Sequence, residues 1–343
     1  MSSGQISNLK VRPELYDQTI KLIESSFDYS KGESFQIDFF PLVEKKNAHH
    51  NFILEEGGEV LGHVGVKTRE IGNTNLKLKV ALIGGVAVSE KHRGKGFLTK
   101  LLTEVFKKFD KNVGLYILWG DEINIYKKFD FYLAGGLVES IEAYNPNFNN
   151  RYTKTKFKDI SIKDFNQIKR IYQEFSLKNY ISFLRNDEEW ETLKKIESVD
   201  LYILKSKNEK ILGYFCQNKG MDLKGIVHEF GYLIDHQNEI SELFHSLKTW
   251  YPSSATIKFP GKNIYQALFR MGNVEIFNEF LGKRSHEELL ISKCGKWEVK
   301  IKFKNKTLAI PKEFFFQRIF GPFPPKDLEE ISCQFFFSGL DSV

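Results

Sequence analysis

The most constraining feature of the sequence is a buried strand that runs through a short basic loop into an amphipathic helix. Residues 76–89, LKLKVALIGGVAVS, alternate and then become wholly apolar, as a central strand buried on both faces does. The loop EKHRGKG follows, and residues 97–109, FLTKLLTEVFKKF, then place their apolar side chains on one helical face. The sequence therefore predicts a strand, loop and helix unit within an α/β fold with mixed sheets.

The loop has the composition of a site for phosphate groups. The start of a helix leaves backbone N–H groups unpaired at its positive end, where anions bind. Gly94 and Gly96 let the backbone approach a pyrophosphate closely. Two other phosphate loops are excluded, because GxxxxGK[ST] needs a lysine after the spaced glycines and GxGxxG needs a glycine where Thr99 stands.

The order of elements repeats along the chain. At 343 residues we expect two domains and a smaller third piece. In the first part, a strand is predicted at 9–12, a helix at 16–27 and a hairpin around the glycines at 57–58. A linker rich in Asn at 145–152 precedes a second run of similar elements that lacks the EKHRGKG loop.

Two further predictions concern the later part of the chain. Residues 263–272, NIYQALFRMG, are predicted to form the last helix of the second run. From Lys296 onward the sequence alternates, which predicts a hairpin around Asn305 and Lys306, and it finishes with a tail rich in Pro and Phe.

Composition and charge narrow the functional classes. The formal charge is only +6 and the signs are intermingled, which argues against a nucleic-acid partner. The three cysteines lack CxxC spacing, and no apolar run reaches the roughly 18 residues of a membrane span, so we expect a cytoplasmic protein without a membrane span. The adjacent pair His49 and His50 lacks the spacing of a metal site, so no metal is expected.

Two segments together resemble the GNAT superfamily of N-acetyltransferases. In that superfamily an (R/Q)xxGx(G/A) loop holds the pyrophosphate of acetyl-CoA, and a later helix of the form Y-x-K-x-G-F supplies a tyrosine near the thioester sulfur. The second motif is matched by Tyr126, Lys128 and Phe131. The chain departs from the family pattern at Leu98, where the loop usually ends in a small residue, and at Asp130, where the helix motif has glycine.

The resemblance implies acetyl-CoA as cosubstrate and a set of residues that bind it. The strand before the loop is expected to contribute main-chain groups near its end. The expected binding residues are Val86, Val88, Arg93, Gly94, Lys95, Gly96, Phe97 and Leu98.

The loop sequence RGKGFL is similar to that of the enhanced-intracellular-survival group of tandem GNAT proteins, whose loop ends in two bulky apolar residues. That group has a first GNAT unit that binds acetyl-CoA, a degenerate second unit and a C-terminal domain related to sterol carrier proteins. The resemblance implies a GNAT domain at 1–147, a degenerate GNAT-like domain at 148–285 and a small α+β element at 286–343, an abbreviated sterol-carrier-like piece. Only the first unit is expected to bind acetyl-CoA.

Acyl transfer from a thioester to an amine sets the chemistry that such a site must supply. The reaction passes through a tetrahedral oxyanion, which the backbone N–H of Val88 could stabilise near the end of the strand. The departing thiolate needs a proton, and Tyr126 could donate it because a tyrosine hydroxyl has a pKa of about 10. The alternative for Tyr126 is a core aromatic residue beside Phe129.

The general base is less visible, because residues 82–88 contain no Asp or Glu. The enhanced-intracellular-survival group directs its C-terminal carboxylate into the acetylation site, and the resemblance implies this catalytic role for the carboxylate of Val343. Residues 335–343 are apolar almost to the end, which suits a buried segment. The alternative is that this segment has no catalytic role and only fills the core of the third element. Glu55, Glu56 and His63 are the alternative bases.

The resulting prediction is an acetyl-CoA-dependent N-acetyltransferase. The acetyl group would pass to a primary amine by direct attack in a ternary complex, and the amine is expected to belong to a small molecule or a lysine side chain. The alternative is a non-catalytic module that binds acyl-CoA or lipid. The sequence leaves the oligomeric state open.

Overall fold

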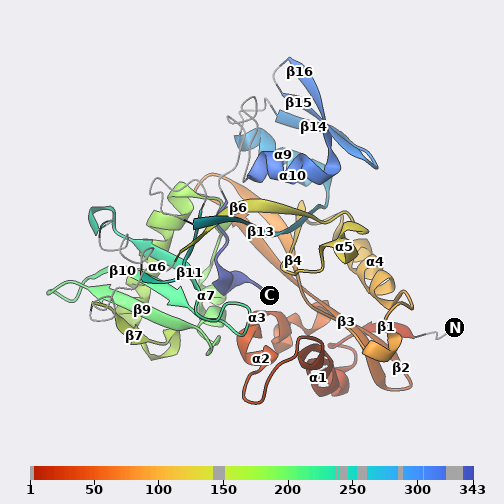
Figure 1. The fold of residues 1–343 in the computed structure, drawn as a ribbon, viewed down its shortest axis with the longest axis horizontal. Helices are drawn as coiled ribbons and strands as arrows, with labels where there is room; N and C mark the ends of the chain where they lie inside the picture. The colour runs from red at the N-terminus through yellow and green to blue at the C-terminus, as the bar shows by residue number, and fades with distance from the viewer. Residues whose placement is uncertain are drawn as a thin grey trace.

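In the computed structural model, the described residues are 4–141, 151–236, 238, 246–252, 261–284, 289–303, 305–321 and 335–343. Across these residues the chain forms three sheets with helices beside them (Figure 1). The mixed α/β class predicted from the sequence is confirmed. No helix among the described residues is both long and apolar enough to cross a membrane.

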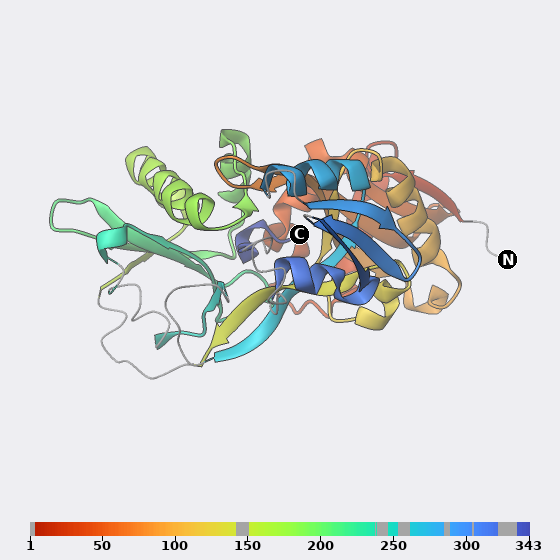
Figure 2. The same cartoon turned by 90° about the horizontal axis from the view of Figure 1, so that it is seen from above.

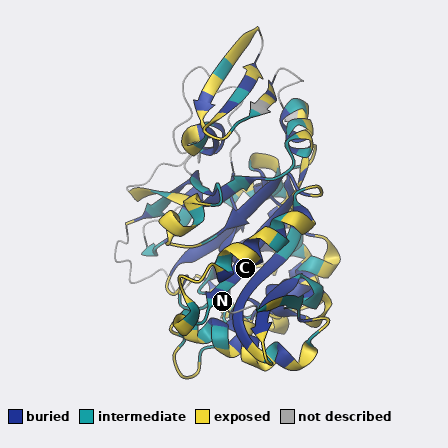
Figure 3. Cartoon of the chain, turned by 90° about the vertical axis from the view of Figure 1, so that its right-hand side faces the viewer, coloured by how far each residue is buried: buried dark blue, intermediate teal, exposed yellow. Residues whose placement is uncertain are grey.

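The largest sheet in the described part of the chain has the strand order β1, β2, β3, β4, β5, β13, β6, β12, and β8 lies beside β3. Its strands are β1 Gln5–Asn8, β2 Asn51–Glu56, β3 Glu59–Gly72, β4 Lys77–Val88, β5 Leu115–Leu118, β6 Tyr132–Ser140, β8 Ser182–Phe183, β12 Trp250–Pro252 and β13 Gly261–Met271. β4 and β5 are parallel, whereas β4 pairs with β3 in the antiparallel sense. Figure 3 shows the long central strands as a continuous buried band.

Alternate residues of β4 point to two separate cores, one on each face of this sheet. Ala81 and Ile83 belong to the core under helix α4, Phe97–Phe109. Val80 and Leu82 belong to the core on the opposite face. That face is covered by α1 Tyr16–Ser26, α2 Phe35–Asp38, α3 Phe40–Val43, α9 Val274–Arg284 and α10 Lys312–Phe320. The wholly apolar end of the strand is thus explained, because both of its faces are buried.

The second unit repeats the first in its order of helix and antiparallel strands. Helices α6 Ile162–Asn179 and α7 Asp187–Leu193 precede a sheet of the order β11, β10, β9, β7. The strands are β7 Thr153–Thr155, β9 Asp200–Lys205, β10 Ile211–Gln217 and β11 Val227–Tyr232. The side chain of Ser161 caps α6 and Asn186 forms a capping box with Glu189 at α7, so local sequence fixes both helix starts.

The smallest sheet contains the predicted C-terminal hairpin. Its strands are β14 Leu289–Cys294, β15 Glu298–Phe303 and β16 Lys306–Pro311, paired in that order. The turn falls between Phe303 and Lys306, as predicted around Asn305. Val299 and Ile301 are buried while Lys302 is exposed, so the alternating lysines form the outer face of the hairpin.

The prediction of a helix at 263–272 is wrong, because this segment is strand β13 and lies between β5 and β6 in the largest sheet. Ala267 and Phe269 face one core of that sheet while Leu268 faces the other. The spacing of apolar residues fits a helix almost as well, and the pairing with two distant strands decides the conformation.

Other boundaries differ less. The first strand is Gln5–Asn8 instead of 9–12, because the side chain of Asn8 accepts hydrogen bonds from Lys10 N and Val11 N and turns the chain there. Most of the predicted linker at 145–152 lies outside the described residues. The domain boundaries at 147 and 285 stay a prediction, and β13 is a segment from the predicted second domain that completes the sheet of the first.

The last residues return to the middle of the molecule, between the second unit and the largest sheet (Figures 1 and 2). Phe336 N donates to Ile181 O at 3.1 Å, and Gln266 Nε2 donates to Phe337 O at 2.9 Å. Phe335, Phe336 and Phe337 are each at most 3% exposed. Burial of one such side chain contributes roughly 1.5–3 kcal/mol, so this tail is part of the core.

Candidate active site

The predicted phosphate loop is open and exposed at the start of α4. A short 3-10 turn, Glu90–His92, leads from β4 into the loop, and Gly96 is the N-cap of the helix. Gly94 and Gly96 have φ of 78° and 79°, which glycine adopts without strain, and a Cβ atom at either position would have no atom within 4 Å. Arg93 and Lys95 are exposed beside them. Positive charge and free helix N–H groups therefore meet at one place with room for an anion.

The remaining loop residues hold the helix start against the sheet. Phe97 is 2% exposed, and its ring stacks on His92 with 5.8 Å between centroids. Leu98 is half-buried and packs against the same core. The two bulky residues at the end of RGKGFL thus anchor the first turn, while its main-chain N–H groups stay at the surface of the helix end.

Beside this loop the parallel strands β4 and β5 separate. Their pairing ends at Ile83 and Leu118, and β4 continues to Val88 along β3 only. Val86 and Val88 are half-buried in this continuation, so β5 does not pair with their main-chain groups. We call the opening between the two strands, beyond Ile83 and Leu118, the fork.

A bulge in β4 at the fork was not predicted from the sequence. The register with β3 shifts between the pair Gly65 and Gly84 and the pair His63 and Ala87, and Gly85 has φ of 57°. A bulge turns main-chain groups away from the regular ladder. The signal that could have revealed it is the pair Gly84 and Gly85 inside an otherwise apolar strand.

His63 holds this bulge and is fully buried. Its Nδ1 lies 2.6 Å from Gly85 O, and its Nε2 lies 3.0 Å from Asn51 Oδ1. Burial lowers the pKa of His63 to about 4, although the contact with Gly85 O opposes this shift. A neutral imidazole has one N–H and can donate to only one of these two oxygens. Both ring nitrogens nevertheless face protein atoms in a fully buried site, which favours a structural role over that of a general base.

The two glutamates considered as bases lie at the β2 and β3 hairpin. Glu55 is buried and forms an ion pair with Arg12. Glu56 is exposed at the end of β2. The predicted hairpin is confirmed, and it places both residues at the turn between β2 and β3, whereas the fork lies beyond the end of β5.

Tyr126 lies on α5, Ile123–Lys127, on the same face of the sheet as α4. Its ring meets Phe131 edge-on with 6.2 Å between centroids, and its Cε2 would lie 3.5 Å from a Cβ atom on Gly120, just beyond β5. Burial, with a smaller effect of the Glu122 carboxylate, raises the pKa of Tyr126 to about 12. The hydroxyl therefore carries its proton at neutral pH.

The departure at Asp130 has a structural explanation. Asp130 has φ of 65°, the conformation that the glycine of the family motif would adopt without strain. Its Oδ2 accepts a hydrogen bond from Lys312 Nζ of α10 at 2.7 Å. The carboxylate thus links the turn after α5 to the C-terminal element, which glycine could not do.

The C-terminal carboxyl lies against the bulge, on the other face of the sheet from Tyr126. Val343 is 7% exposed and belongs to the core that contains Leu82. A Cβ atom on Gly84 would lie 2.3 Å from the carboxyl carbon of Val343 and 2.3 Å from one of its oxygens. No side chain could stand at position 84 with the chain end in this place. The structure brings Val343 and the bulge together, and Tyr126 approaches the fork from the opposite face.

Among the described residues, no three His, Cys, Asp or Glu side chains gather in a way that could hold a metal ion. The ring of His49 instead lies beside that of His50, with 3.8 Å between centroids. The pair forms part of the short 3-10 helix Lys45–His50 before β2.

Comparison with known proteins identifies the family of the first unit. Residues 9–134 match the family model described as "Acetyltransferase (GNAT) domain". No curated protein matches the chain. Among solved structures, a GCN5-related N-acetyltransferase from Kribbella flavida is 11% identical with a TM-score of 0.63, and the match covers 99% of each chain.

Two further structures are similar over most of the chain. A GCN5-related N-acetyltransferase from Anabaena variabilis ATCC 29413 is 14% identical with a TM-score of 0.59, covering 97% of each chain. Eis1 from Mycobacterium abscessus is 13% identical with a TM-score of 0.57, covering 90% of this chain and 84% of that one. At these identities the likeness concerns the fold, and it extends over both units and the C-terminal element.

Proposed function

We propose that the chain transfers an acetyl group from acetyl-CoA to a primary amine. The proposal starts from the premise that residues 9–134 form a GNAT acetyltransferase domain and that the chain is an acyltransferase. The observation that carries this proposal is the open basic loop at the start of α4, directly beside the fork between β4 and β5. Acetyl-CoA would supply an acetyl thioester, which an amine can attack. The amine would belong to a small molecule or a lysine side chain.

The coenzyme fits the residues present. The Cβ positions of Gly94 and Gly96 are open, so the loop backbone is accessible to a pyrophosphate, and Arg93 and Lys95 supply positive charge. Main-chain N–H groups of Val86 and Val88 lie where β4 lacks a partner in β5, and they would stabilise negative charge that develops on the acetyl oxygen.

The reaction needs one proton acceptor and one proton donor. The amine nitrogen forms a bond to the acetyl carbon as the bond between that carbon and sulfur breaks. The carboxylate of Val343, directly or through a water molecule, would accept the proton that the amine loses. The hydroxyl of Tyr126 would give its proton to the sulfur and later regain one from solvent. Their placement on opposite faces of the sheet suits groups that act on opposite sides of the acetyl carbon.

Burial acts on both groups. The fork is flanked by the apolar cores that contain Leu82 and Ile83, so a carboxylate there would be partly desolvated, which would favour its role as proton acceptor. With a pKa of about 12, Tyr126 is protonated at neutral pH, although the shift makes it a weaker acid than an exposed tyrosine. The two groups can therefore start the reaction in the protonation states that it requires.

A screen of primary amines with mass detection of acetylated products tests the proposal. Turnover with at least one amine is expected, together with one acetyl-CoA site per chain in titration calorimetry, because only the first unit has the loop. Acetyl-CoA binding without transfer to any amine would favour the non-catalytic acyl-CoA-binding module instead. Two equivalent sites per chain would contradict the assignment of the coenzyme to the first unit alone.

A further inference from the structure

The end of the chain is a buried turn whose main-chain oxygens surround one buried lysine. The 3-10 turn Gly339–Asp341 leads into the last two residues, and every residue from 335 to 343 is buried. Lys219, which follows β10, is 0% exposed. Its Nζ lies within hydrogen-bond distance of four acceptors, which share its three N–H groups: the carbonyl oxygens of Gly339 at 3.0 Å, Leu340 at 3.2 Å and Ser342 at 2.6 Å, and Ser342 Oγ at 3.0 Å.

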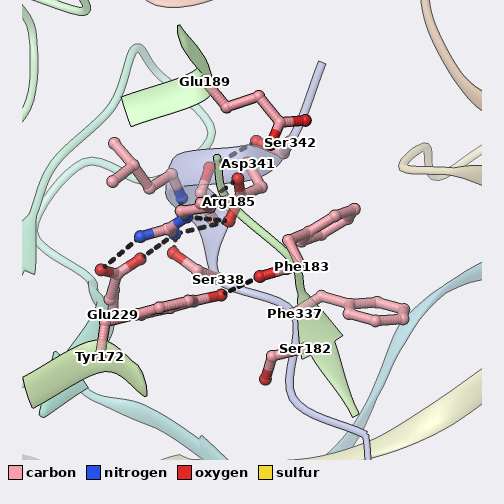
Figure 4. A network of polar contacts seen from close by, with 12 residues as sticks. Tyr172, Ser182, Phe183, Arg185, Glu189, Glu229, Phe337, Ser338, Asp341 and Ser342 are labelled. Carbon is pink, nitrogen blue, oxygen red and sulfur yellow. Dashed lines mark hydrogen bonds and ion pairs between the residues drawn. The ribbon is translucent and has the colours of Figure 1, made fainter. Parts of the chain in front are cut away.

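A second set of contacts holds the side chain of Asp341 in this turn (Figure 4). Arg185 Nη2 lies 2.5 Å from Asp341 Oδ2, and Arg69 Nη2 lies 3.0 Å from Asp341 Oδ1. Arg185 also pairs with the buried carboxylate of Glu229. Although burial alone would raise it, the two arginines bring the pKa of Asp341 below its usual value. These bonds fasten the turn by one side chain, whereas those of Lys219 fix the path of its main chain.

Lys219 combines complete burial with hydrogen bonds to a single segment of the chain. A buried ammonium group is costly unless hydrogen bonds and charges compensate for its lost hydration. The carboxylates of Asp341, Asp38 and Asp222 raise the pKa of Lys219, but burial lowers it more strongly, to about 7. All the hydrogen bonds that it donates, among the described residues, end on the segment from Gly339 to Ser342. The hydrogen bonds that compensate for the burial of the Lys219 ammonium group therefore all act on the position of the chain end.

The fixed segment ends one residue before the terminal carboxyl. The shortest contact of Lys219, 2.6 Å, is to Ser342 O, and the carboxyl of the next residue, Val343, lies against Gly84. The side chain of Val343 is itself buried in the core. With the carbonyl of Ser342 held and the side chain of Val343 packed, the carboxyl carbon of Val343 has little freedom to move.

We propose that Lys219 is a positioning residue for acetyl transfer, because it holds the main chain of residues 339–342 so that the carboxylate of Val343 stands at the fork. This inference rests on the proposed function, in which that carboxylate is the base. Displacement of a reacting group by about 1 Å can lower a rate by about 100-fold. Loss of Lys219 is therefore expected to lower kcat while leaving the coenzyme loop, which Lys219 does not contact, intact.

A double-mutant cycle separates this role from a general contribution to stability. The chain has a cysteine at position 333, so a peptide of residues 333–343 can be joined to residues 1–332 by native chemical ligation without any change of sequence. The peptide is made with either a carboxylate or a carboxamide at Val343, and each form is combined with Lys219 or with Lys219→Met. Lys207→Met, at an exposed lysine in the β9 and β10 turn, is the matched control.

In the carboxylate protein, Lys219→Met should lower kcat by about 10- to 100-fold with little change in the Kd of acetyl-CoA. In the carboxamide protein, the same substitution should lower the residual kcat by less than about 2-fold, because the group that it positions is no longer a base. Lys207→Met should change neither value. Ser342→Ala removes one acceptor of Lys219 and also the hydrogen bond that Ser342 Oγ donates to Gly339 O, and it is expected to lower kcat by about 3- to 10-fold.

Equal losses from Lys219→Met in the carboxylate and carboxamide proteins would overturn the proposal, because a merely structural role is additive. Full turnover of both Lys219→Met and Ser342→Ala in the carboxylate protein would also overturn it, and would leave the proposed function standing. Full turnover of the carboxamide protein would instead overturn the assignment of the base, and this proposal with it.

Discussion

The loop at residues 93–98 and the turn at residues 338–343 border the same fork, yet they are built in opposite ways. The loop is exposed, its two glycines face open space and its helix N–H groups lack partners within the helix. The turn is wholly buried, and lysine and arginine side chains bind its main chain and its one carboxylate side chain. An open segment can adapt to a ligand that arrives, whereas a saturated segment can fix one atom in place. We infer that the loop binds acetyl-CoA and that the turn holds the Val343 carboxylate, which accepts the proton of the amine.

The largest effect on kcat is expected from Gly84→Ala. The added methyl group would overlap the carboxyl of Val343, so the chain end must move away from the fork. Loss of a general base typically lowers a rate by 10²- to 10⁴-fold, and we expect kcat to fall by about 10³-fold with little change in the Kd of acetyl-CoA. Steady-state kinetics and calorimetry measure the two values.

Gly295→Ala is the control. A Cβ atom at Gly295, in the turn between β14 and β15, would lie 3.2 Å from Glu298 O and would not touch Val343. Normal kcat in the Gly84→Ala protein would show that the turn tolerates displacement and does not hold a catalytic group in place.

The next effect concerns pH. His228 packs against Gly339 of the turn, and its Nε2 donates to Asn218 O at 2.9 Å. Burial lowers the pKa of His228 to about 4. The folded protein therefore binds fewer protons than the unfolded chain between pH 6.5 and 4. The stabilisation is complete above pH 6.5 and decreases as the pH falls toward 4, by roughly 3 kcal/mol for this residue.

Urea unfolding at pH 7 and pH 4 measures this loss. The buried His63 contributes in the same direction, so the informative quantity is the difference between the wild type and His228→Gln. The variant should lose less stability on acidification. An equal loss in both proteins would show that the turn does not depend on a neutral His228.

Tyr126→Phe removes one hydroxyl and keeps the ring that packs on Phe131. We expect kcat to fall by about 10²-fold, at the low end for general acid catalysis because a CoA thiolate is a tolerable leaving group. The thermal midpoint and the Kd of acetyl-CoA should hardly change. Tyr265→Phe, at an exposed tyrosine of β13, is the matched control. Unchanged kcat at a saturating amine concentration would remove Tyr126 from the mechanism.

The smallest effect is expected at the loop, because an open segment can partly adapt. Gly96→Val adds a side chain at φ of 79° and narrows the approach to the helix N–H groups, which should raise the Kd of acetyl-CoA by about 10-fold, as expected for roughly 1.4 kcal/mol. Gly58→Val places the same strain at φ of 84° in the turn between β2 and β3, with equal space around it. Equal Kd values for the two variants would show that the loop does not contact the coenzyme.

Local patterns predicted the elements around the loop. The apolar face of 97–109 gives α4, and the paired glycines at 57–58 give the β2 and β3 hairpin, because periodicity and turn residues act within a few positions. The segment 263–272 was mistaken for a helix, since its partners β5 and β6 lie more than a hundred residues earlier in the chain.

The turn was only partly predictable. An apolar end at 335–343 suggested burial, and the family resemblance suggested a role for Val343. Lys219, in the polar segment QNKGMD, gave no signal, because its partners lie 120 to 123 residues away and are main-chain oxygens, which have no sequence pattern. The positive φ of Asp130 could not be predicted for a similar reason. Lys312, which donates a hydrogen bond to the Asp130 carboxylate, belongs to the C-terminal element.

The most direct test of the account is the turnover of a protein with one glycine appended after Val343. The extra residue moves the terminal carboxylate by one position while leaving the loop, Tyr126 and Lys219 unchanged. We expect kcat to fall by about 10²- to 10⁴-fold with an unchanged Kd of acetyl-CoA, whereas one glycine added at the N-terminus should have no effect. Full kcat in the C-terminally extended protein would contradict the assignment of the Val343 carboxylate as the base.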